Sequence, residues 1–232
     1  MPSYSRSEAA LLLAESRLRR AVASHLATTA ERESGYGSSS LLRLQPGLLL
    51  TLAGIFELGR QASRRASAEA LRAQLEATPG IPRLDYTVEH DTAADRIQAA
   101  AAAGAIASGL VLMALPRVEG GKPLRPALRL AAREQRKAVA RHAATEVSRA
   151  FSNEREAILS HNYRSNARAF RDAGLVKVWS SALDQRTCGP CRDLDGTEVA
   201  IDSDFPGGRT PGFHPLCRCL IEVRRASQRM AA

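Results

Sequence analysis

The chain has 232 residues, of which 44% are hydrophobic and 4% aromatic, which is typical of one large or two small globular domains. A net charge of +9 and a pI near 10.1 indicate an anionic partner, such as nucleic acid, an acidic protein surface or lipid headgroups, or else a solvated basic surface. The apolar run at residues 9–14 is interrupted by Glu15 and then by arginines, so no secretory signal is expected. We therefore expect the chain to be made in a reducing cytoplasm, where disulfides rarely persist.

Three helices are expected in the first half of the chain. Pro46 suits the start of the second helix, and Pro79-Gly80 suits its end. The third helix contains 17 consecutive residues without a charge, from Ala99 to Leu115. A transmembrane helix needs roughly 20 strongly apolar residues. This alanine-rich segment therefore favours a buried core helix over a membrane span. The predicted helices cover residues 7–33, 47–78 and 92–115, and residues 79–91 are a connector.

A proline- and glycine-rich stretch at residues 116–123 is the strongest candidate domain boundary. It would separate a helical region, residues 1–120, from a second domain, residues 121–232. The second domain begins with a predicted long helix within residues 124–173: residues 124 to about 158 form one helix, and residues 160–173 are a second helix or its continuation. After Gly174 three short segments alternate like strands. They are residues 175–180, 196–201 and 219–224, and together they predict a small β-rich C-terminal module at residues 175–225.

All four cysteines of the chain lie in this module, beside one histidine. In a reducing compartment such a cluster indicates a metal site before it indicates disulfides. Cys188 and Cys191 flank a tight Gly-Pro turn, and His214, Cys217 and Cys219 supply three further donors. A structural Zn²⁺ takes four such ligands and leaves no open position for catalysis. We therefore expect an α+β fold with a zinc-stapled module, and the spacing leaves open which four of the five donors bind zinc.

The sequence CGPC at residues 188–191 also occurs in the active site of thioredoxins. That site needs the two cysteines between a strand and a helix, with βαβ structure before it and a ββα unit after it. Only 41 residues follow Cys191, and the next segment, RDLDGTEV, is typical of a turn and not of a helix. A thiol-disulfide oxidoreductase is therefore the alternative, and metal binding is the preferred interpretation.

Basic residues form a ridge with a spacing of four within the predicted long helix. Like charges four residues apart on a helix repel each other, so an anionic partner would stabilise them. Packaged DNA or an acidic protein surface would serve, and a solvated helix face is the alternative. Because no aromatic residues are interleaved, any DNA contact would be to phosphates and independent of sequence. The predicted contact residues are Arg125, Arg129, Arg133, Lys137 and Arg141, with Arg136 widening the ridge.

The C-terminal pattern resembles that of the phage head morphogenesis, or minor head protein, family, which includes the phage Mu F protein. The shared pattern is a Trp-bearing strand, then D-x-R-T-C-x-x-C-x-x-L-D-G, then H-P-x-C-R-C. A weaker match, Arg-x-x-x-Thr-Glu-x-x-Arg-Ala, lies upstream, and the resemblance covers about residues 125–225. The residues that carry it are Trp179, Asp184, Arg186, Thr187, Cys188, Cys191, Leu194, Asp195, Gly196, His214, Pro215, Cys217, Arg218 and Cys219, with Arg141, Thr145, Glu146 and Arg149 upstream.

This resemblance implies a structural minor capsid protein of a tailed bacteriophage, present in several copies at the portal vertex of the virion. It implies roles in head assembly and in the passage or ejection of DNA. The implied partners are the portal protein, other head proteins and packaged double-stranded DNA. Residues 1–120 are expected to contact the portal or neighbouring subunits.

No catalytic constellation is visible in the sequence, so the protein is expected not to be an enzyme. The five histidines are scattered, and neither a serine elbow nor a Walker-type glycine loop is present. His90 and Asp91 are adjacent but have no second base or nucleophile nearby in the sequence. Besides the oxidoreductase, two other hypotheses for the function are a zinc-stapled nucleic-acid-binding protein and a membrane-active protein that uses residues 99–115.

Overall fold

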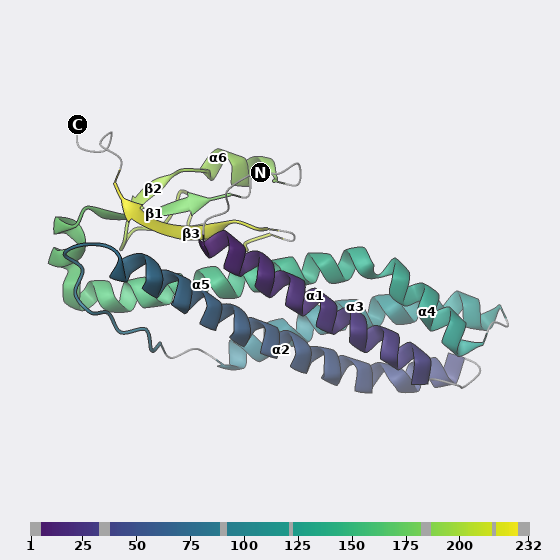
Figure 1. The fold of residues 1–232 in the computed structure, drawn as a ribbon. Coiled ribbons are helices and arrows are strands. Elements are labelled where there is room, and N and C mark those ends of the chain that lie inside the picture. Colours follow the sequence, from purple (N-terminus) through teal and green to yellow (C-terminus); the bar gives the residue numbers. More distant parts are fainter. Residues whose placement is uncertain are drawn as a thin grey trace. The chain divides into compact units, whose positions relative to one another are not determined.

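The computed structural model of the chain describes residues 6–32, 38–88, 92–120, 123–181, 187–214 and 217–226 (Figure 1). Within them the fold is mainly helical with one small sheet, which confirms the α+β class. The adjacent His90 and Asp91 lie outside the described residues. The elements are α1 (Arg6–Arg32), α2 (Ser38–Glu76), α3 (Thr92–Glu119), α4 (Leu124–Glu134), α5 (Arg136–Asp172), β1 (Leu175–Ser180), α6 (Gly189–Leu194), β2 (Glu198–Ala200) and β3 (Leu220–Arg225).

The predicted helices are present, but two of their boundaries were misplaced by prolines. α2 begins at Ser38, so Pro46 lies inside the helix and not in its first turn. α3 likewise continues through Pro116 to Glu119. A proline removes one backbone hydrogen-bond donor from a helix interior. In both helices the surrounding residues keep the helical conformation despite this loss.

The predicted long helix after the boundary is divided at Gln135, within the stretch expected to be one helix, whereas residues 160–172 continue α5. Gln135 ends α4, and its backbone N–H donates to the carbonyl of Ala131 at 2.9 Å. The Gln135 side chain packs directly against Gly109 of α3, where an added Cβ would lie 2.1 Å from Gln135 Nε2. α5 then continues to Asp172 with one non-helical residue, Asn166. The division thus lies where two helices approach each other closely.

The contacts of the chain divide it into two compact units that alternate along the sequence. The first unit contains Met1–Ala14, Arg60–His90 and Ala144–Ala232, and the second contains Glu15–Gly59 and Asp91–Ala143. The division into domains 1–120 and 121–232 stays a prediction.

The first unit contains a three-stranded antiparallel sheet in the order β2-β1-β3. β1 was predicted with its exact bounds, β2 is shorter than expected, and β3 begins one residue later than expected. β1 pairs Val176 with Ala200 on one side and Trp179 with Ile221 on the other. Because β1 is the central strand, its side chains are nearly all buried.

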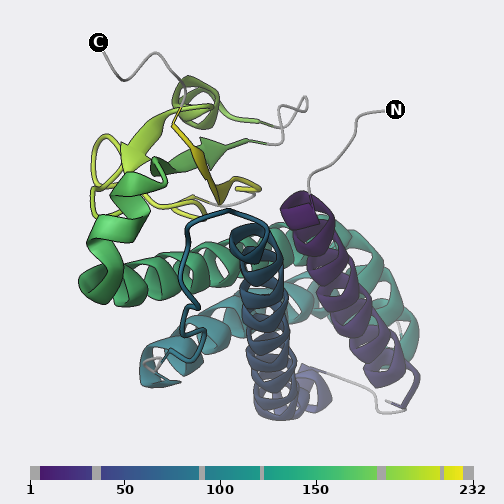
Figure 2. The ribbon, with the colours of Figure 1, turned by 60° about the vertical axis from the view of Figure 1, so that its left-hand side comes forward.

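The sheet lies against the C-terminal half of α5 within this unit (Figure 2). Ser148 Oγ donates to the carbonyl of Cys219 at 2.8 Å, and Arg155 Nη1 donates to the carbonyl of Ile221 at 2.6 Å. The Arg155 side chain is fully buried, and this burial lowers the pKa of its guanidinium to about 10. Two polar side chains of α5 therefore hold the C-terminal strand and the segment before it.

The second unit is built around α3, whose small residues allow neighbouring helices to approach closely. Ala103, Ile106 and Ala114 are fully buried, whereas Ile97 and Leu112 are exposed. Among the described residues, α3 is the helix that length and apolar composition alone would allow to cross a membrane. One face of α3 thus belongs to the core of this unit and the other lies on its surface.

Candidate metal centre

The first two cysteines lie at the start of the short helix α6. Cys188 is the N-cap residue, and its sulfur accepts the backbone N–H of Cys191 at 3.4 Å. Pro190 lies in the first turn, where its missing N–H costs nothing. The segment after CGPC was expected to be a turn, and this was wrong for the residues up to Leu194, which are helical. Two signals in the sequence could have revealed this helix start: a cysteine whose sulfur can cap the helix, and a proline in the first turn.

The Leu-Asp-Gly sequence returns the chain from α6 to the sheet. Asp195 Oδ1 accepts the backbone N–H of Ser181 at 2.7 Å. Gly196 has a φ of 74° and donates its N–H to the carbonyl of Trp179 at 2.8 Å. A side chain would strain this positive φ, so glycine suits the position. The Leu194 side chain is buried in the core. The motif thereby fixes α6 beside the end of β1.

The five predicted donors come together in the first unit, in two overlapping groups that share Cys191. In the first group, His214 Nε2 lies 3.1 Å from Cys188 Sγ and 2.9 Å from Cys191 Sγ. In the second group, Cys191 Sγ lies 4.0 Å from Cys217 Sγ, with Cys219 close by. Within each group the donor atoms lie within 4.8 Å of one another. Two thiolates on a tetrahedral zinc are separated by about 3.8 Å, so this cluster can hold a metal ion.

The sulfur atoms differ in their hydrogen bonds. The Cys217 sulfur accepts the backbone N–H of Gly212 at 3.2 Å, as the Cys188 sulfur accepts that of Cys191. The Cys219 sulfur instead lies 3.4 Å from the hydroxyl of Ser181. Backbone N–H donors stabilise a negatively charged sulfur. Cys188 and Cys217 therefore each accept a backbone N–H, whereas the Cys219 sulfur lies against a side-chain hydroxyl.

The thiols also differ in their pKa values. Hydrogen bonding from the Cys219 thiol, and then from the Gly212 backbone, lowers the pKa of Cys217 to about 5 against desolvation. Burial raises the pKa of Cys191 well above its usual range. The hydrogen bond with Cys217, followed by burial, raises that of Cys219. A metal ion binding here must displace protons from buried thiols, and such binding is strongly pH-dependent.

Aromatic side chains pack against His214 and hold its ring in position. The Phe213 ring meets the His214 ring edge to face with centroids 4.6 Å apart, and Phe213 also packs on Trp179 at 6.1 Å. Trp179 is fully buried and makes a second edge contact with Phe205 at 5.3 Å. The motif tryptophan therefore supports the histidine donor through Phe213. Sequence reasoning did not find Phe213, although it immediately precedes His214.

The upstream motif residues on α5 contact the loop that leads into His214. Arg149 Nη2 donates to the carbonyl of Gly212 at 3.2 Å, and Arg149 Nη1 pairs with Glu146 Oε1 at 3.3 Å. Gly212 has a φ of 91°, and a Cβ there would lie 2.7 Å from Arg149 Cα. Glu146 and Thr145 are buried. The two parts of the sequence motif are thus in direct contact.

Glu146 has a second partner, Arg60 of α2, which sequence reasoning missed. The Arg60 guanidinium forms a hydrogen-bonded ion pair with Glu146 Oε2, and both side chains are almost completely buried. No local signal marks Arg60, because its partner lies 86 residues further along the chain.

The other predicted residues are more scattered. The six basic ridge residues are all exposed, and they are divided between α4 and the start of α5. Asp184, Arg186 and Pro215 of the resemblance motif lie outside the described residues.

The fold and the site together define a class of protein. It is mainly helical, and its small antiparallel sheet is joined to a buried Cys/His cluster. The chain belongs to the family described as phage Mu protein F like protein, whose model matches residues 96–222, more than half of the chain. The family resemblance stated above is thus confirmed, and the match begins further upstream, within α3. It ends in β3 and includes all five candidate donors. Comparisons with curated proteins and with solved structures find no match.

Proposed function

We propose that this phage head morphogenesis protein is a structural minor capsid component of a tailed bacteriophage. The observation that carries the proposal is the convergence of the five donors of the family's C-terminal motif on one buried cluster beside α5. A cluster with this many donors can fill all four coordination positions of a metal ion and leave none for a substrate. This suits a structural role better than a catalytic one. The protein would be part of the virion, after synthesis in the host cytoplasm.

The finer proposal is that several copies sit at the portal vertex and act in head assembly and DNA passage. The portal protein, other head proteins and packaged double-stranded DNA are the proposed partners. The family membership supports a place among head proteins. The exposed arginines of α4 and α5 support contact with an anionic surface.

The metal of the proposed site is zinc, held by Cys188, Cys191, His214 and Cys217. Thiolates with one imidazole in a tetrahedral arrangement are typical zinc ligands. His214 Nε2 lies within 3.1 Å of two sulfurs, which a shared ion would bridge. Cys219 would stay outside this set, since Ser181 already engages its sulfur. When bound, zinc would supply a structural cross-link between α6 and the loop before β3.

The proposed capsid role is tested in the phage or prophage that encodes the chain. Purified particles are analysed by quantitative mass spectrometry and electron microscopy, with and without a nonsense mutation in this gene. We expect the protein in wild-type particles, at a few copies for each portal. We expect mutant particles with defective heads or reduced DNA delivery. Absence of the protein from DNA-filled wild-type particles would rule out the capsid role.

The metal centre is tested on the purified protein by elemental analysis, with thiol titration before and after chelation. We expect about one zinc ion per chain and cysteines that react only after chelation. An oxidoreductase is the competing reading, favoured by the position of Cys188 before a helix. Metal-free protein with a readily formed Cys188–Cys191 disulfide and turnover of a disulfide substrate would establish that alternative instead.

A further inference from the structure

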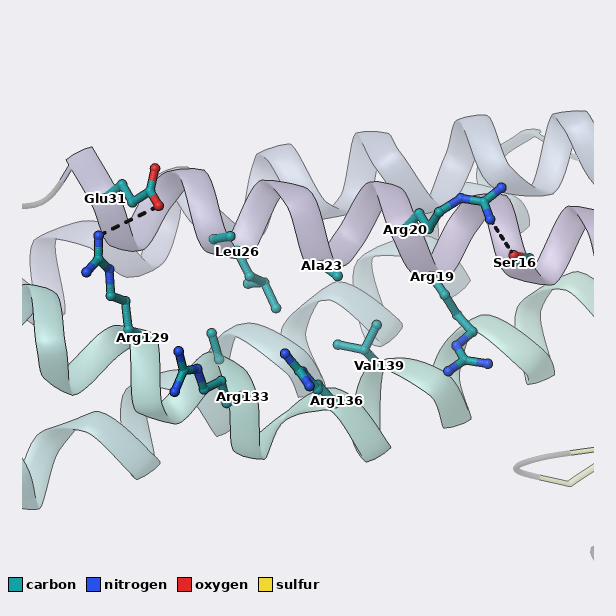
Figure 3. Close-up of a pocket in the computed structure, with 12 residues that line it drawn as sticks. Ser16, Arg19, Arg20, Ala23, Leu26, Glu31, Arg129, Arg133, Arg136 and Val139 are labelled. Carbon is teal, nitrogen blue, oxygen red and sulfur yellow. Dashed lines mark hydrogen bonds and ion pairs between the residues drawn. The ribbon is translucent and has the colours of Figure 1, made fainter.

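A groove in the second unit is lined by arginines from two distant parts of the sequence (Figure 3). It lies between α1 on one side and α4 with the start of α5 on the other, and its volume is about 790 Å³. Arg19 and Arg20 come from α1, and Arg129, Arg133 and Arg136 come from α4 and α5. Only three of the six predicted ridge residues therefore line it, and they face two arginines that the sequence analysis did not single out.

The arginines of the groove are only partly neutralised: Arg19 pairs with the buried carboxylate of Glu15 at 3.6 Å, and Arg129 pairs with Glu31. Glu31 is the one acidic residue among those that line it. Its carboxylate lies 3.7 Å from Arg129, but both side chains are more than half exposed, so the pair contributes little. In the described part of the chain, neither Arg133 nor Arg136 has a carboxylate within ion-pair distance, and both are exposed. The groove thus keeps a concentrated positive charge.

The floor of the groove between these arginines is apolar. Leu26 and Val139 form its base and are almost completely buried. Exposed Ala23 and Ala27 of α1 and half-buried Ala132 of α4 complete it. Among the residues that the structure describes, no aromatic side chain lines the groove, so it offers no platform for stacking of nucleic-acid bases. A ligand that fits must present anionic groups at its edges and apolar groups between them.

We propose that this groove binds an acidic, amphipathic segment of a partner protein. Arginine pairs with carboxylates through two parallel hydrogen bonds, and apolar side chains of the segment would cover the alanine, leucine and valine floor. A phosphodiester backbone would satisfy the arginines but has no apolar groups for that floor. The lining extends along α1 from Ser16 to Glu31, about 22 Å, which suits roughly four helical turns of a bound segment. This inference names the chemistry of one protein contact and does not depend on the metal centre.

The test uses the full chain and a labelled synthetic peptide of about 16 residues, a length matched to the groove. The peptide is built from Leu, Ala and Glu, with leucines on one helical face and glutamates on both sides of that face. A scrambled peptide of equal composition and a short double-stranded DNA are the competing ligands. Binding is measured by fluorescence anisotropy at about 0.1 M and about 0.5 M salt.

Two variants separate the groove from general surface charge. Arg133→Gln with Arg136→Gln removes two arginines that line the groove. Lys137→Gln with Arg83→Gln removes the same charge at two exposed positions that do not line it. A third variant, Ala23→Gln, places a polar side chain on the floor without changing the charge. Circular dichroism and the midpoint of thermal unfolding confirm that each variant is folded.

We expect the groove variant to weaken peptide binding by about tenfold or more, and the charge-matched control by no more than about twofold. We expect Ala23→Gln to weaken binding of the amphipathic peptide but not of the scrambled peptide. Equal binding of both peptides, or equal loss in both double variants, would overturn the proposal. So would full displacement of the peptide by duplex DNA with no effect of Ala23→Gln, because the groove would then be a phosphate-binding surface.

Discussion

Two hydrogen bonds act on one buried sulfur at Cys217. The backbone of Gly212 donates to it, and the Cys219 thiol lies beside it as a second donor. The sulfur is almost inaccessible to solvent, yet its pKa is lowered, so hydrogen bonding outweighs desolvation. The lowered pKa of Cys217 favours a negative charge at the place where a cation would bind.

This charge predicts how the stability of the chelated protein depends on pH. The pKa of Cys217 is about 5 in the folded protein and 9.0 ordinarily, so its stabilising effect is fully present above about pH 9 and is lost as the pH falls toward 5. The raised pKa values of Cys191 and Cys219 act oppositely, because folding then loses stability as the pH rises above 9. Thermal unfolding of the chelated protein should show a midpoint that rises from pH 5 to pH 9 and then falls. Cys217→Ser should flatten the rising part, and an unchanged rise would show that other groups cause it.

The ligand set gives a second prediction at the residue scale. Replacing Cys188, Cys191 or Cys217 by serine removes a zinc ligand, so we expect loss of stoichiometric zinc. Cys219→Ser removes only a neighbouring hydrogen-bonded thiol, which typically costs about 10- to 100-fold in metal affinity. Zinc affinity is measured by competition with a chromophoric chelator. If Cys188→Ser retains zinc and Cys219→Ser loses it, the site belongs instead to the group of Cys191, Cys217 and Cys219.

At the scale of the elements, α2 and α5 are joined by a line of buried polar contacts. Ser63 Oγ donates to the carbonyl of Val147 at 2.9 Å, and Ser67 Oγ donates to that of Phe151 at 2.6 Å. The Arg60 ion pair continues this line by one turn. Small side chains on α2 thus allow close approach, and their hydroxyl groups satisfy carbonyls on α5.

The buried ion pair predicts strongly non-additive substitutions. Arg60→Met removes the buried guanidinium that pairs with Glu146, and Glu146→Leu removes the buried carboxylate that pairs with Arg60. Each single change should lower the free energy of unfolding by about 3–5 kcal/mol, and the double change by much less than the sum. Urea unfolding of the four proteins measures this coupling. Additive effects would show that the pair does not interact when the protein is folded.

Most elements were predictable because their signals are local. Alternation of apolar residues identified β1 with its exact bounds, and uncharged or amphipathic runs identified the helices. The errors arose where tertiary contacts override local preference. Pro46 and Pro116 lie inside helices that continue past them, and the break at Gln135 lies where its side chain packs against Gly109 of α3.

At the scale of the whole molecule, the five donors could be predicted from spacing and residue type, but their environment could not. Gly212, Phe213 and Ser181 reach the site through turns and edge contacts that leave no recurrent pattern in one sequence. The two units alternate along the chain, so their membership depends on long-range contacts that proline and glycine stretches do not reveal. Only one side of the arginine groove was predictable, because the basic residues of α4 and α5 recur with a regular spacing and those of α1 do not.

The separation into two units predicts a selective response to metal removal. Zinc would cross-link only the first unit, so chelation should destabilise the segment at residues 175–225 and its contacts with α5. Backbone amides at residues 15–59 and 91–143 should keep their protection. Hydrogen exchange followed by mass spectrometry, before and after chelation, measures both regions in one experiment. Equal loss of protection in both would mean that the metal stabilises the protein as a whole.

The central position of β1 sets an order of events during translation. Its partner β3 is the last strand to be synthesised, and the buried Arg155 guanidinium has no Ile221 carbonyl to bind until then. The sulfur atoms of Cys188 and Cys191 likewise leave the ribosome before His214 and Cys217 do. The nascent chain therefore passes through a stage with two exposed thiols and an unfinished sheet. During that stage the exposed thiols are open to oxidation, and the unpaired edge of β1 is open to capture by chaperones.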